Sequence, residues 1–191
     1  MVSMRNSRSA MVALGANLSQ NSNSLSEILV MAVSAISTKD VAIRQVSRIY
    51  SSPCFPDGAG PDYVNAAALI ETSLSPEALL DHLHCIEAVF GRVRGVRWGQ
   101  RTLDLDLLAV GDLVLPDAAT QDHWRDMPPD QQAQTAPDRL ILPHPRLQDR
   151  AFVLVPLAEI APGWRHPRLG KTVLEMLAAL KTADIAGVTP L

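Results

Sequence analysis

Two aspartates separated by a single leucine are the residues of this sequence best placed to do chemistry, Asp104 and Asp106 in the run Arg-Thr-Leu-Asp-Leu-Asp-Leu. The alternation of leucine with polar residues predicts a β-strand, in which alternate side chains share a face. Both carboxylates would then lie on one face, about 7 Å apart. Because neighbouring carboxylates repel each other, a cation should compensate them, and Mg²⁺ is the natural candidate because it prefers oxygen ligands. An exposed strand face neutralised by arginine is an equally good interpretation of an aspartate pair alone.

A basic loop directly precedes this strand. Its arginines are Arg92, Arg94, Arg97 and Arg101, and glycines lie between them. A guanidinium group binds phosphate oxygens through a planar fork and keeps its charge at all physiological pH values. A basic loop followed by two aspartates is the combination that polyphosphate transfer requires, with a metal bridging the phosphates and arginines stabilising developing charge. Trp98 in the same loop could stack on a base, so binding of single-stranded nucleic acid is an alternative.

Two further segments carry polar and aromatic residues. Tyr63 and Asn65 alternate onto one face of another expected strand, which follows a proline-rich loop over residues 53–62. An aromatic ring beside an amide can hold a flat heterocycle and read its edge, although both residue types are more often structural in strands. Residues 142–152 add a histidine, two arginines and a phenylalanine.

The elements that must position these residues follow the order β-α-β-β-α-β. Strands are expected at 11–14, 41–50, 63–71 and 102–110, with a short one at 113–115, and helices at 25–36, 76–90, 152–160 and from 172 onward. Capping residues support the helix starts, for example the Ser24/Glu27 capping box. The order predicts an α+β fold with a ferredoxin-like βαββαβ core, a largely antiparallel sheet, helices packed on one face and extra C-terminal elements.

The chain is interpreted as one domain over residues 1–191. Residues 1–9 are expected to form a loose tail, and residues 117–138 a mobile insertion, because Pro, Gln, Ala and Asp dominate there without a hydrophobic period. Since this insertion offers no candidate ligands either, we expect that deleting residues 119–135 would leave turnover within a few-fold of its normal value.

Composition excludes several classes of protein. Of the 191 residues 47% are hydrophobic and 19% charged, which excludes a disordered polyelectrolyte, and the net charge of −3 argues against a general coat for nucleic acids. No apolar run approaches the roughly 20 residues that span a bilayer. Cys54 and Cys85 lie in no metal-binding pattern and are expected to be reduced thiols of a cytoplasmic protein.

With these features assembled, the sequence resembles the 6-hydroxymethyl-7,8-dihydropterin pyrophosphokinase family of folate biosynthesis. The matching stretches occur in the family's order and cover most of residues 11–165. They are residues 14–18, 61–67, 91–94, 97–106, 142–144 and 150–152. The Arg-Thr-Leu-Asp-Leu-Asp run, with Trp-Gly before it, is the most specific of them.

The resemblance implies transfer of the β,γ-pyrophosphoryl group of ATP to the hydroxymethyl oxygen of the dihydropterin, releasing AMP. It implies two Mg²⁺ ions held by Asp104 and Asp106, which would be catalytic together with Arg94 and Arg101. The residues that it places at ATP are Glu87, Arg92, Arg94, Trp98, Arg101, Arg139, His144 and Arg150. The residues that it places at the pterin are Ser52, Pro53, Phe55, Tyr63, Asn65 and Phe152. It further implies a monomer that acts on these two small molecules and binds neither nucleic acid nor membrane.

The sequence departs from the family pattern at a few positions. Ala16 replaces a usual serine, His84 stands where glutamine is common, and Cys54 and Phe55 change the rim of the expected pterin pocket. None of these changes removes a proposed phosphate or metal ligand.

Two other functions fit parts of the sequence. A nucleic-acid-binding module would use Trp98 and the arginines, but the aspartate pair would repel a phosphate backbone. A metal-dependent phosphodiesterase would need a base that activates water, and the sequence shows no further carboxylate beside Asp104.

Overall fold

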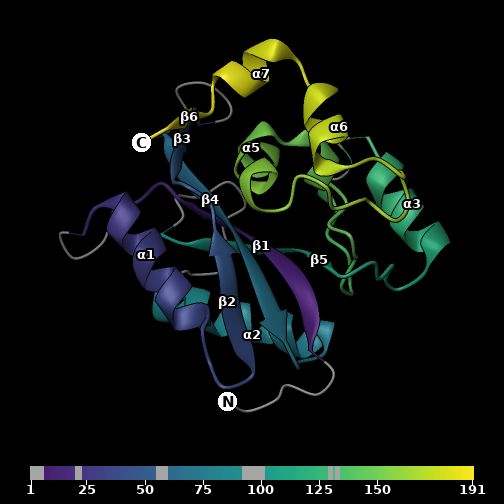
Figure 1. Cartoon of the computed structure of the whole chain (residues 1–191), viewed down its shortest axis with the longest axis horizontal. Helices are drawn as coiled ribbons and strands as arrows, with labels where there is room; N and C mark the ends of the chain where they lie inside the picture. Colours follow the sequence, from purple (N-terminus) through teal and green to yellow (C-terminus); the bar gives the residue numbers. More distant parts are fainter. Residues whose placement is uncertain (1–6, 20–22, 55–59, 92–101, 129–130, 132–133) are drawn as a thin grey trace.

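The computed structural model describes residues 7–19, 23–54, 60–91, 102–128, 131 and 134–191 (Figure 1). In chain order the elements are β1 (Arg8–Ala16), α1 (Leu25–Ile36), β2 (Val41–Val46), β3 (Tyr50–Ser52), β4 (Tyr63–Thr72), α2 (Pro76–Val89), β5 (Asp104–Val110), α3 (Ala118–Asp126), the 3₁₀ helix η1 (Leu147–Asp149), α5 (Ala151–Ile160), α6 (Val173–Ala178), α7 (Thr182–Ala186) and β6 (Thr189–Pro190).

A six-stranded sheet forms the centre of the fold. Its strand order is β5-β1-β4-β3-β6, and β2 also pairs with β4. All of these pairings are antiparallel. β1 therefore lies between β4 and β5, and the two helices α1 and α2 connect strands as in a βαββαβ core, which confirms the predicted fold class.

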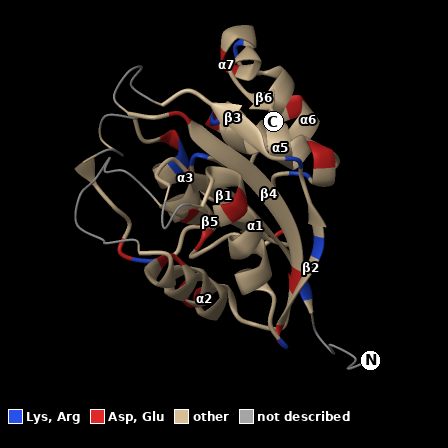
Figure 2. Ribbon diagram, turned by 90° about the vertical axis from the view of Figure 1, so that its left-hand side faces the viewer, with Lys and Arg blue, Asp and Glu red and all other residues tan. Residues whose placement is uncertain are grey.

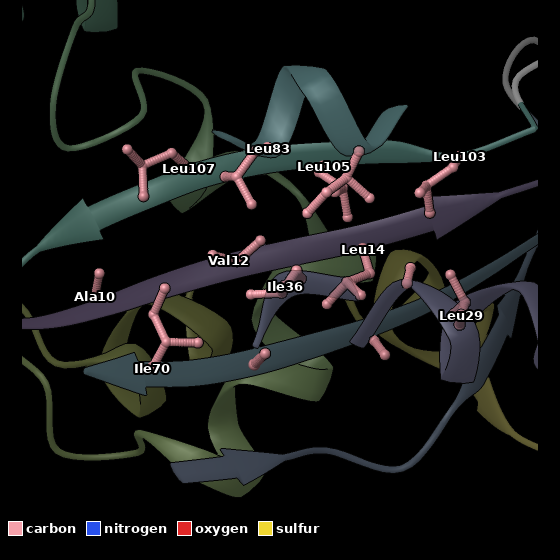
Figure 3. Packing of buried hydrophobic residues seen from close by; sticks show 14 of the residues in the cluster. Ala10, Val12, Leu14, Leu29, Ile36, Ile70, Leu83, Leu103, Leu105 and Leu107 are labelled. Carbon is pink, nitrogen blue, oxygen red and sulfur yellow. The ribbon is translucent and has the colours of Figure 1, made fainter. Parts of the chain in front are cut away.

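One face of the sheet packs against α1 and α2 and forms the larger hydrophobic core (Figures 2 and 3). Alternate residues of β1 and of the first part of β5 point into it, including Leu14, Leu105 and Leu107, each at most 3% exposed. α1 begins at the predicted capping box, in which the Ser24 backbone N–H donates to Glu27 Oε2 at 2.7 Å. The alternation that identified the strands in the sequence is thus the alternation that buries their leucines.

The opposite face is covered over part of its area by α5 and α6, which form a second cluster with Met11, Ala67, Leu108 and Ala109. The predicted core has its helices on one face, which α1 and α2 confirm, and α5 and α6 are among the extra C-terminal elements that the sequence predicted. At a β-bulge in β5, where Val12 pairs with Leu107 and Met11 pairs with Ala109, the two consecutive residues Leu108 and Ala109 both join this cluster. On this face β5 is polar before the bulge and apolar after it.

Several predicted boundaries are wrong in detail. β1 extends back to Arg8, inside the predicted tail, and residues 1–6 lie outside the described residues. The strand expected over 41–50 is divided into β2 and β3, with a register shift between Ile43 and Gln45. The strand expected at 113–115 consists of one bridge, between Leu115 and Leu142.

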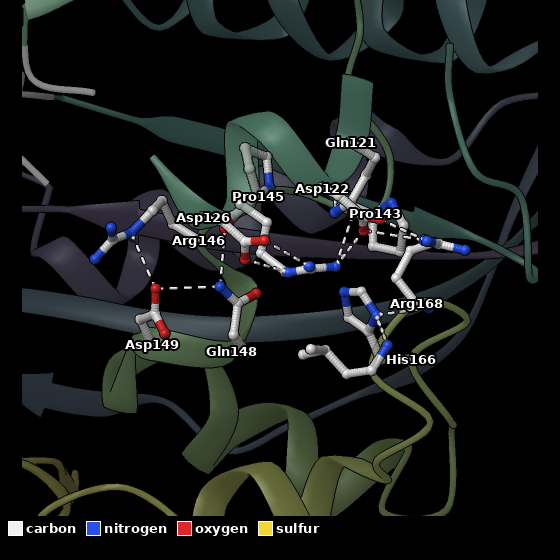
Figure 4. A network of polar contacts seen from close by, with 12 residues as sticks. Gln121, Asp122, Asp126, Pro143, Pro145, Arg146, Gln148, Asp149, His166 and Arg168 are labelled. Carbon is white, nitrogen blue, oxygen red and sulfur yellow. Dashed lines mark hydrogen bonds and ion pairs between the residues drawn. The ribbon is translucent and has the colours of Figure 1, made fainter. Parts of the chain in front are cut away.

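The insertion expected to lack structure contains a helix. Asp117 caps the N-terminus of α3, where its Oδ1 accepts the backbone N–H of Thr120 at 2.9 Å. No apolar stripe marks this helix in the sequence, because its buried residue is the polar Gln121. α3 instead contacts the segment between α5 and α6 through charged groups. Arg168 Nε of that segment donates to Asp122 Oδ1 at 3.0 Å (Figure 4).

His166 lies fully buried beside this ion pair. Its Nδ1 accepts the backbone N–H groups of Arg168 and Leu169, each at 3.2 Å. Burial, together with the charges of Arg125 and Arg168, lowers the pKa of His166 from 6.5 to about 4 against the opposing charge of Asp122. The folded protein therefore holds this imidazole neutral.

The neutral His166 predicts a loss of stability in weak acid. The folded-state pKa lies below the unfolded one, so the contribution is complete above pH 6.5 and is lost as the pH falls toward 4. Between pH 7 and pH 5 the wild type should lose about 2 kcal/mol more unfolding free energy than His166→Asn, which cannot titrate there. Urea unfolding of both proteins at the two pH values measures the difference. Equal losses of unfolding free energy in the two proteins would contradict a neutral His166.

Candidate active site

The two aspartates of β5 lie on the sheet face opposite the larger core. Leu105, between them, is buried on the core side, whereas Asp106 keeps a third of its side-chain surface exposed. In the antiparallel register Asp104 pairs with Gly15 and Asp106 pairs with Ala13. Because both partners on β1 are small, no bulky side chain from that strand covers the carboxylates.

Gly15 connects the aspartates to the next strand. It pairs with Asp104 on one side and with Asn65 of β4 on the other, so these three residues form one row across three strands. A Cβ atom at Gly15 would lie 3.5 Å from Asn65 Oδ1. The row therefore carries an acidic group and an amide on one face, with no side chain between them.

The amide end of this row is already fixed in place. Asn65 Nδ2 donates to Ser52 Oγ of β3 at 2.9 Å, and both residues are buried. Ser52 is the register partner of Tyr63, at the start of β4. Three of the residues expected at the pterin, Ser52, Tyr63 and Asn65, thus lie on two paired strands, and Pro53 follows directly.

The start of α5 brings a positive charge to the aspartates. Arg150 Nη1 lies 3.5 Å from Asp106 Oδ2, and the guanidinium lies over the ring of Phe152, 5.6 Å from its centroid. Phe152 itself is 38% exposed, which is high for a phenylalanine in the first turn of a packed helix. α5 therefore places one cation and one aromatic face at the edge of the acidic pair.

His144 lies in the segment before α5 and is fixed through its backbone and its ring. Its N–H donates to Leu108 O of β5 at 2.8 Å, and its Nδ1 accepts the N–H of Arg146 at 3.1 Å. Burial, together with the charges of Arg150 and Arg146, lowers the pKa of His144 to about 3, and the charge of Asp104 opposes this shift. The imidazole is therefore neutral at physiological pH, and because Nδ1 is an acceptor, Nε2 carries the hydrogen and is a donor.

Glu87 has a role that the sequence did not indicate. Its side chain on α2 is 1% exposed, and Oε1 accepts the backbone N–H of Leu105 at 2.8 Å. The carboxylate thus holds β5 between Asp104 and Asp106. Contact of Glu87 with a nucleotide stays a prediction.

The remaining predicted residues are not brought to the aspartates by the described structure. Arg139 lies on an exposed segment, where its Nε is 3.2 Å from Asp138 Oδ1. The residues expected in the basic loop and at the pocket rim, namely Phe55, Arg92, Arg94, Trp98 and Arg101, lie outside the described residues.

An ion pair links the residue segment just before β3 to α5, and the sequence analysis did not predict it. Arg48 Nε donates to Glu159 Oε1 at 2.6 Å, and Arg48 Nη2 lies 3.2 Å from the hydroxyl oxygen of Tyr50. Tyr50 is in turn the register partner of Asn65. Since Arg48 and Glu159 are 111 residues apart, no local pattern could have indicated this contact.

Within the described ranges, no group of three or more His, Cys, Asp or Glu side chains is arranged to hold a metal ion. Two adjacent carboxylates that share a solvent-accessible face match the way Mg²⁺ binds, with one or two protein carboxylates and the remaining oxygens from phosphates and water. The donor set of Asp104 and Asp106 fits such an ion. The same part of the chain contains no helix with the length and apolar composition needed to cross a membrane.

Comparison with known proteins gives a consistent result. The family described as 7,8-dihydro-6-hydroxymethylpterin-pyrophosphokinase (HPPK) matches residues 11–162 of this chain. A protein of Synechocystis sp. named 2-amino-4-hydroxy-6-hydroxymethyldihydropteridine pyrophosphokinase is 40% identical over 150 residues, covering 78% of this chain and 66% of the relative, just under two thirds of its length. A protein of the same name from Pseudomonas aeruginosa is 40% identical over 168 residues, covering 88% and 89%.

Solved structures support the fold. The crystal structure of wild-type HPPK-DHPS from Plasmodium falciparum aligns with a TM-score of 0.61 and 13% identity, covering 91% of this chain and 44% of that one. At this identity the likeness concerns the fold alone.

Replacing Glu87 tests its structural role. Glu87→Ala leaves the buried Leu105 N–H without an acceptor and opens a cavity, so it should lower the unfolding free energy by about 3 kcal/mol. Glu87→Gln keeps an oxygen acceptor and should cost about 1 kcal/mol. Urea unfolding measures both values, and equal losses in the two variants would show that the bond to Leu105 is not what makes Glu87 important.

Proposed function

The chain belongs to the 7,8-dihydro-6-hydroxymethylpterin-pyrophosphokinase family, and we propose that it transfers the β,γ-pyrophosphoryl group of ATP to the hydroxymethyl oxygen of 6-hydroxymethyl-7,8-dihydropterin, releasing AMP. The family is a group of transferases of folate biosynthesis. In the proposed reaction the hydroxymethyl oxygen attacks the β-phosphorus, and the bond between that phosphorus and the oxygen bridging to the α-phosphate breaks. The hydroxyl proton leaves, and AMP departs with the bridging oxygen.

The observation that carries this proposal is the row formed by Asp104, Gly15 and Asn65. Two strand spacings separate the backbones of the outer residues, about 10 Å. That span suits a heterocycle held at the amide end and a phosphate chain held at the acid end, with the reacting atoms over Gly15. A side chain at position 15 would occupy this space.

We assign the pterin to the amide end. Asn65 and Ser52 offer donors and acceptors to a heterocycle edge, and their mutual bond fixes their orientation before the substrate arrives. Tyr63 at the start of β4 and Phe152 in the first turn of α5 would each stack on one ring face. The sequence assigns Pro53 and Phe55 to the same pocket.

We assign the phosphates of ATP to the acid end. Asp104 and Asp106 would hold two Mg²⁺ ions, which supply positive charge to the phosphate oxygens when bound. Arg150 would exchange its contact with Asp106 for a phosphate oxygen at the N-terminus of α5, where the helix dipole favours an anion. The neutral imidazole of His144 would donate from Nε2 to another phosphate oxygen.

The basic loop completes the proposed phosphate site. Arg94 and Arg101, with Arg92 beside them, would neutralise charge that develops during transfer, and Trp98 would close over the nucleotide. Glu87 and Arg139 are assigned to the nucleotide side on the family resemblance.

A direct assay tests the proposal. The protein is incubated with ATP, Mg²⁺ and 6-hydroxymethyl-7,8-dihydropterin, and the products are separated by chromatography and identified by ³¹P NMR. Formation of AMP and a pterin diphosphate in equal amounts is expected, with no turnover in EDTA. ADP as the product, or no reaction with the pterin, would refute the proposal.

Removing either carboxylate should abolish most of the turnover. Asp104→Asn and Asp106→Asn each keep the size of the side chain but lose its charge, and turnover should fall by a factor on the order of 10²–10³, as for loss of one preorganised electrostatic group. The melting temperature without Mg²⁺ should hold or rise, because like-charge repulsion is relieved. The double variant should lose much less than the product of the two factors. Near-normal turnover in either single variant would contradict the metal assignment.

Truncating Phe152 should raise the KM for the pterin and leave the KM for ATP unchanged. Phe152→Ala removes one stacking face, so the KM for the pterin should rise roughly tenfold, since aromatic stacking contributes about 1–1.5 kcal/mol. Steady-state kinetics with each substrate varied in turn measures this, and Phe152→Tyr is the control that keeps the ring. Equal rises in both KM values would place Phe152 in a structural role.

A further inference from the structure

Helix α3 docks on the segment before His144 through one buried polar side chain. Gln121 is fully buried, and its Nε2 donates to the carbonyl oxygen of Pro143 at 3.1 Å (Figure 4). Its Oε1 lies 3.4 Å from Arg125 Nη1, on the next turn of the same helix. Both the nitrogen and the oxygen of the side-chain amide therefore have hydrogen-bond partners. The bond from the nitrogen connects α3 to Pro143, the residue that precedes His144.

The segment that Gln121 contacts is held by backbone hydrogen bonds on both sides of Pro143, and Gln121 supplies the contact at Pro143 itself. The His144 N–H donates to Leu108 O of β5, and the His144 carbonyl accepts the N–H of Leu147 at 3.0 Å. Pro143 has no N–H to donate, so its carbonyl oxygen is its one backbone hydrogen-bonding group, and Gln121 contacts that group. α3 therefore contacts the backbone directly before His144, in addition to the hydrogen bonds that His144 makes with Leu108 and Arg146.

The other contacts of α3 hold it against the rest of the chain. Asp122 accepts a hydrogen bond from Arg168 Nε, outside the helix, at 3.0 Å, and Arg125 Nη1 of the same helix donates to Asp122 at 2.6 Å. The backbone bridge between Leu115 and Leu142 joins the two ends of the segment that contains α3. α3 is thus a helix with defined contacts to the rest of the chain, and the effect of deleting residues 119–135 on turnover stays a prediction.

We propose that Gln121 is a positioning residue for His144: by holding the Pro143 carbonyl, it fixes the imidazole where it meets the phosphates of the nucleotide. The proposal rests on the proposed function in one respect, the contact between His144 and ATP. The placement of His144 by Gln121 does not depend on it.

Kinetics separate this role from a general contribution to folding. Gln121→Met keeps the size of the side chain and removes the donor, and it should raise the KM for ATP roughly 5- to 10-fold, as for one lost hydrogen bond. The KM for the pterin should stay within about twofold, because that site lies on other elements. Arg168→Met is the matched control: it removes the second anchor of α3 and should lower the melting temperature while leaving the KM for ATP within about twofold.

A measurement that needs no activity tests the same point. The His144 N–H should exchange with solvent roughly tenfold faster in Gln121→Met and at the wild-type rate in Arg168→Met, as measured by NMR. Unchanged exchange in Gln121→Met, or equal changes in both variants, would overturn the proposal. If the wild type shows no pyrophosphokinase turnover, the proposed function fails, and the exchange rates still decide the positioning role. If Gln121→Met does not fold, Gln121→Glu replaces it, since an ionised carboxylate of the same size cannot donate to Pro143.

Discussion

The antiparallel register of β1 between β4 and β5 is the constraint on which the rest of the structure depends. It sets Gly15 opposite Asp104 on one side and opposite Asn65 on the other. A slip of one residue would turn the aspartates into the larger core and Leu105 toward solvent, because side chains alternate between the two faces of a strand. Burial of the leucines therefore specifies the position of the carboxylates without any direct contact between them.

One face of the sheet contributes mainly to stability, and the other carries the residues of the candidate active site. One face is apolar along its whole length and packs against α1 and α2. The other changes character at the bulge in β5: beyond it Leu108 and Ala109 join the cluster under α5, and before it Asp104 and Asp106 stay accessible. α5 can consequently rest on the apolar part and still present Arg150 and Phe152 from its first turn at the edge of the polar part.

Polar groups fix the parts of the site that hydrophobic packing does not reach. The Glu87 carboxylate holds the Leu105 amide, Asn65 holds Ser52, and Gln121 holds the carbonyl of Pro143. A buried polar group without a partner costs more than a neutral hydrogen bond contributes, so each of these pairs selects one arrangement of its segment. Such contacts define direction as well as distance, which a site for a charged substrate requires.

The sequence by itself determined the features that depend on local pattern. The alternation in Arg-Thr-Leu-Asp-Leu-Asp-Leu predicted that Asp104 and Asp106 share a face, and the order of strands and helices predicted the antiparallel fold. The family was evident from short motifs in a fixed order. Tertiary structure alone decided the division of β2 from β3, the bond of Glu87 to Leu105, the pairing of Arg48 with Glu159 and the docking of α3. The physical reason is that hydrophobic burial repeats with the period of the backbone and so can be recognised in a sequence, whereas a single polar contact between distant residues has no period and exists only once the chain has folded.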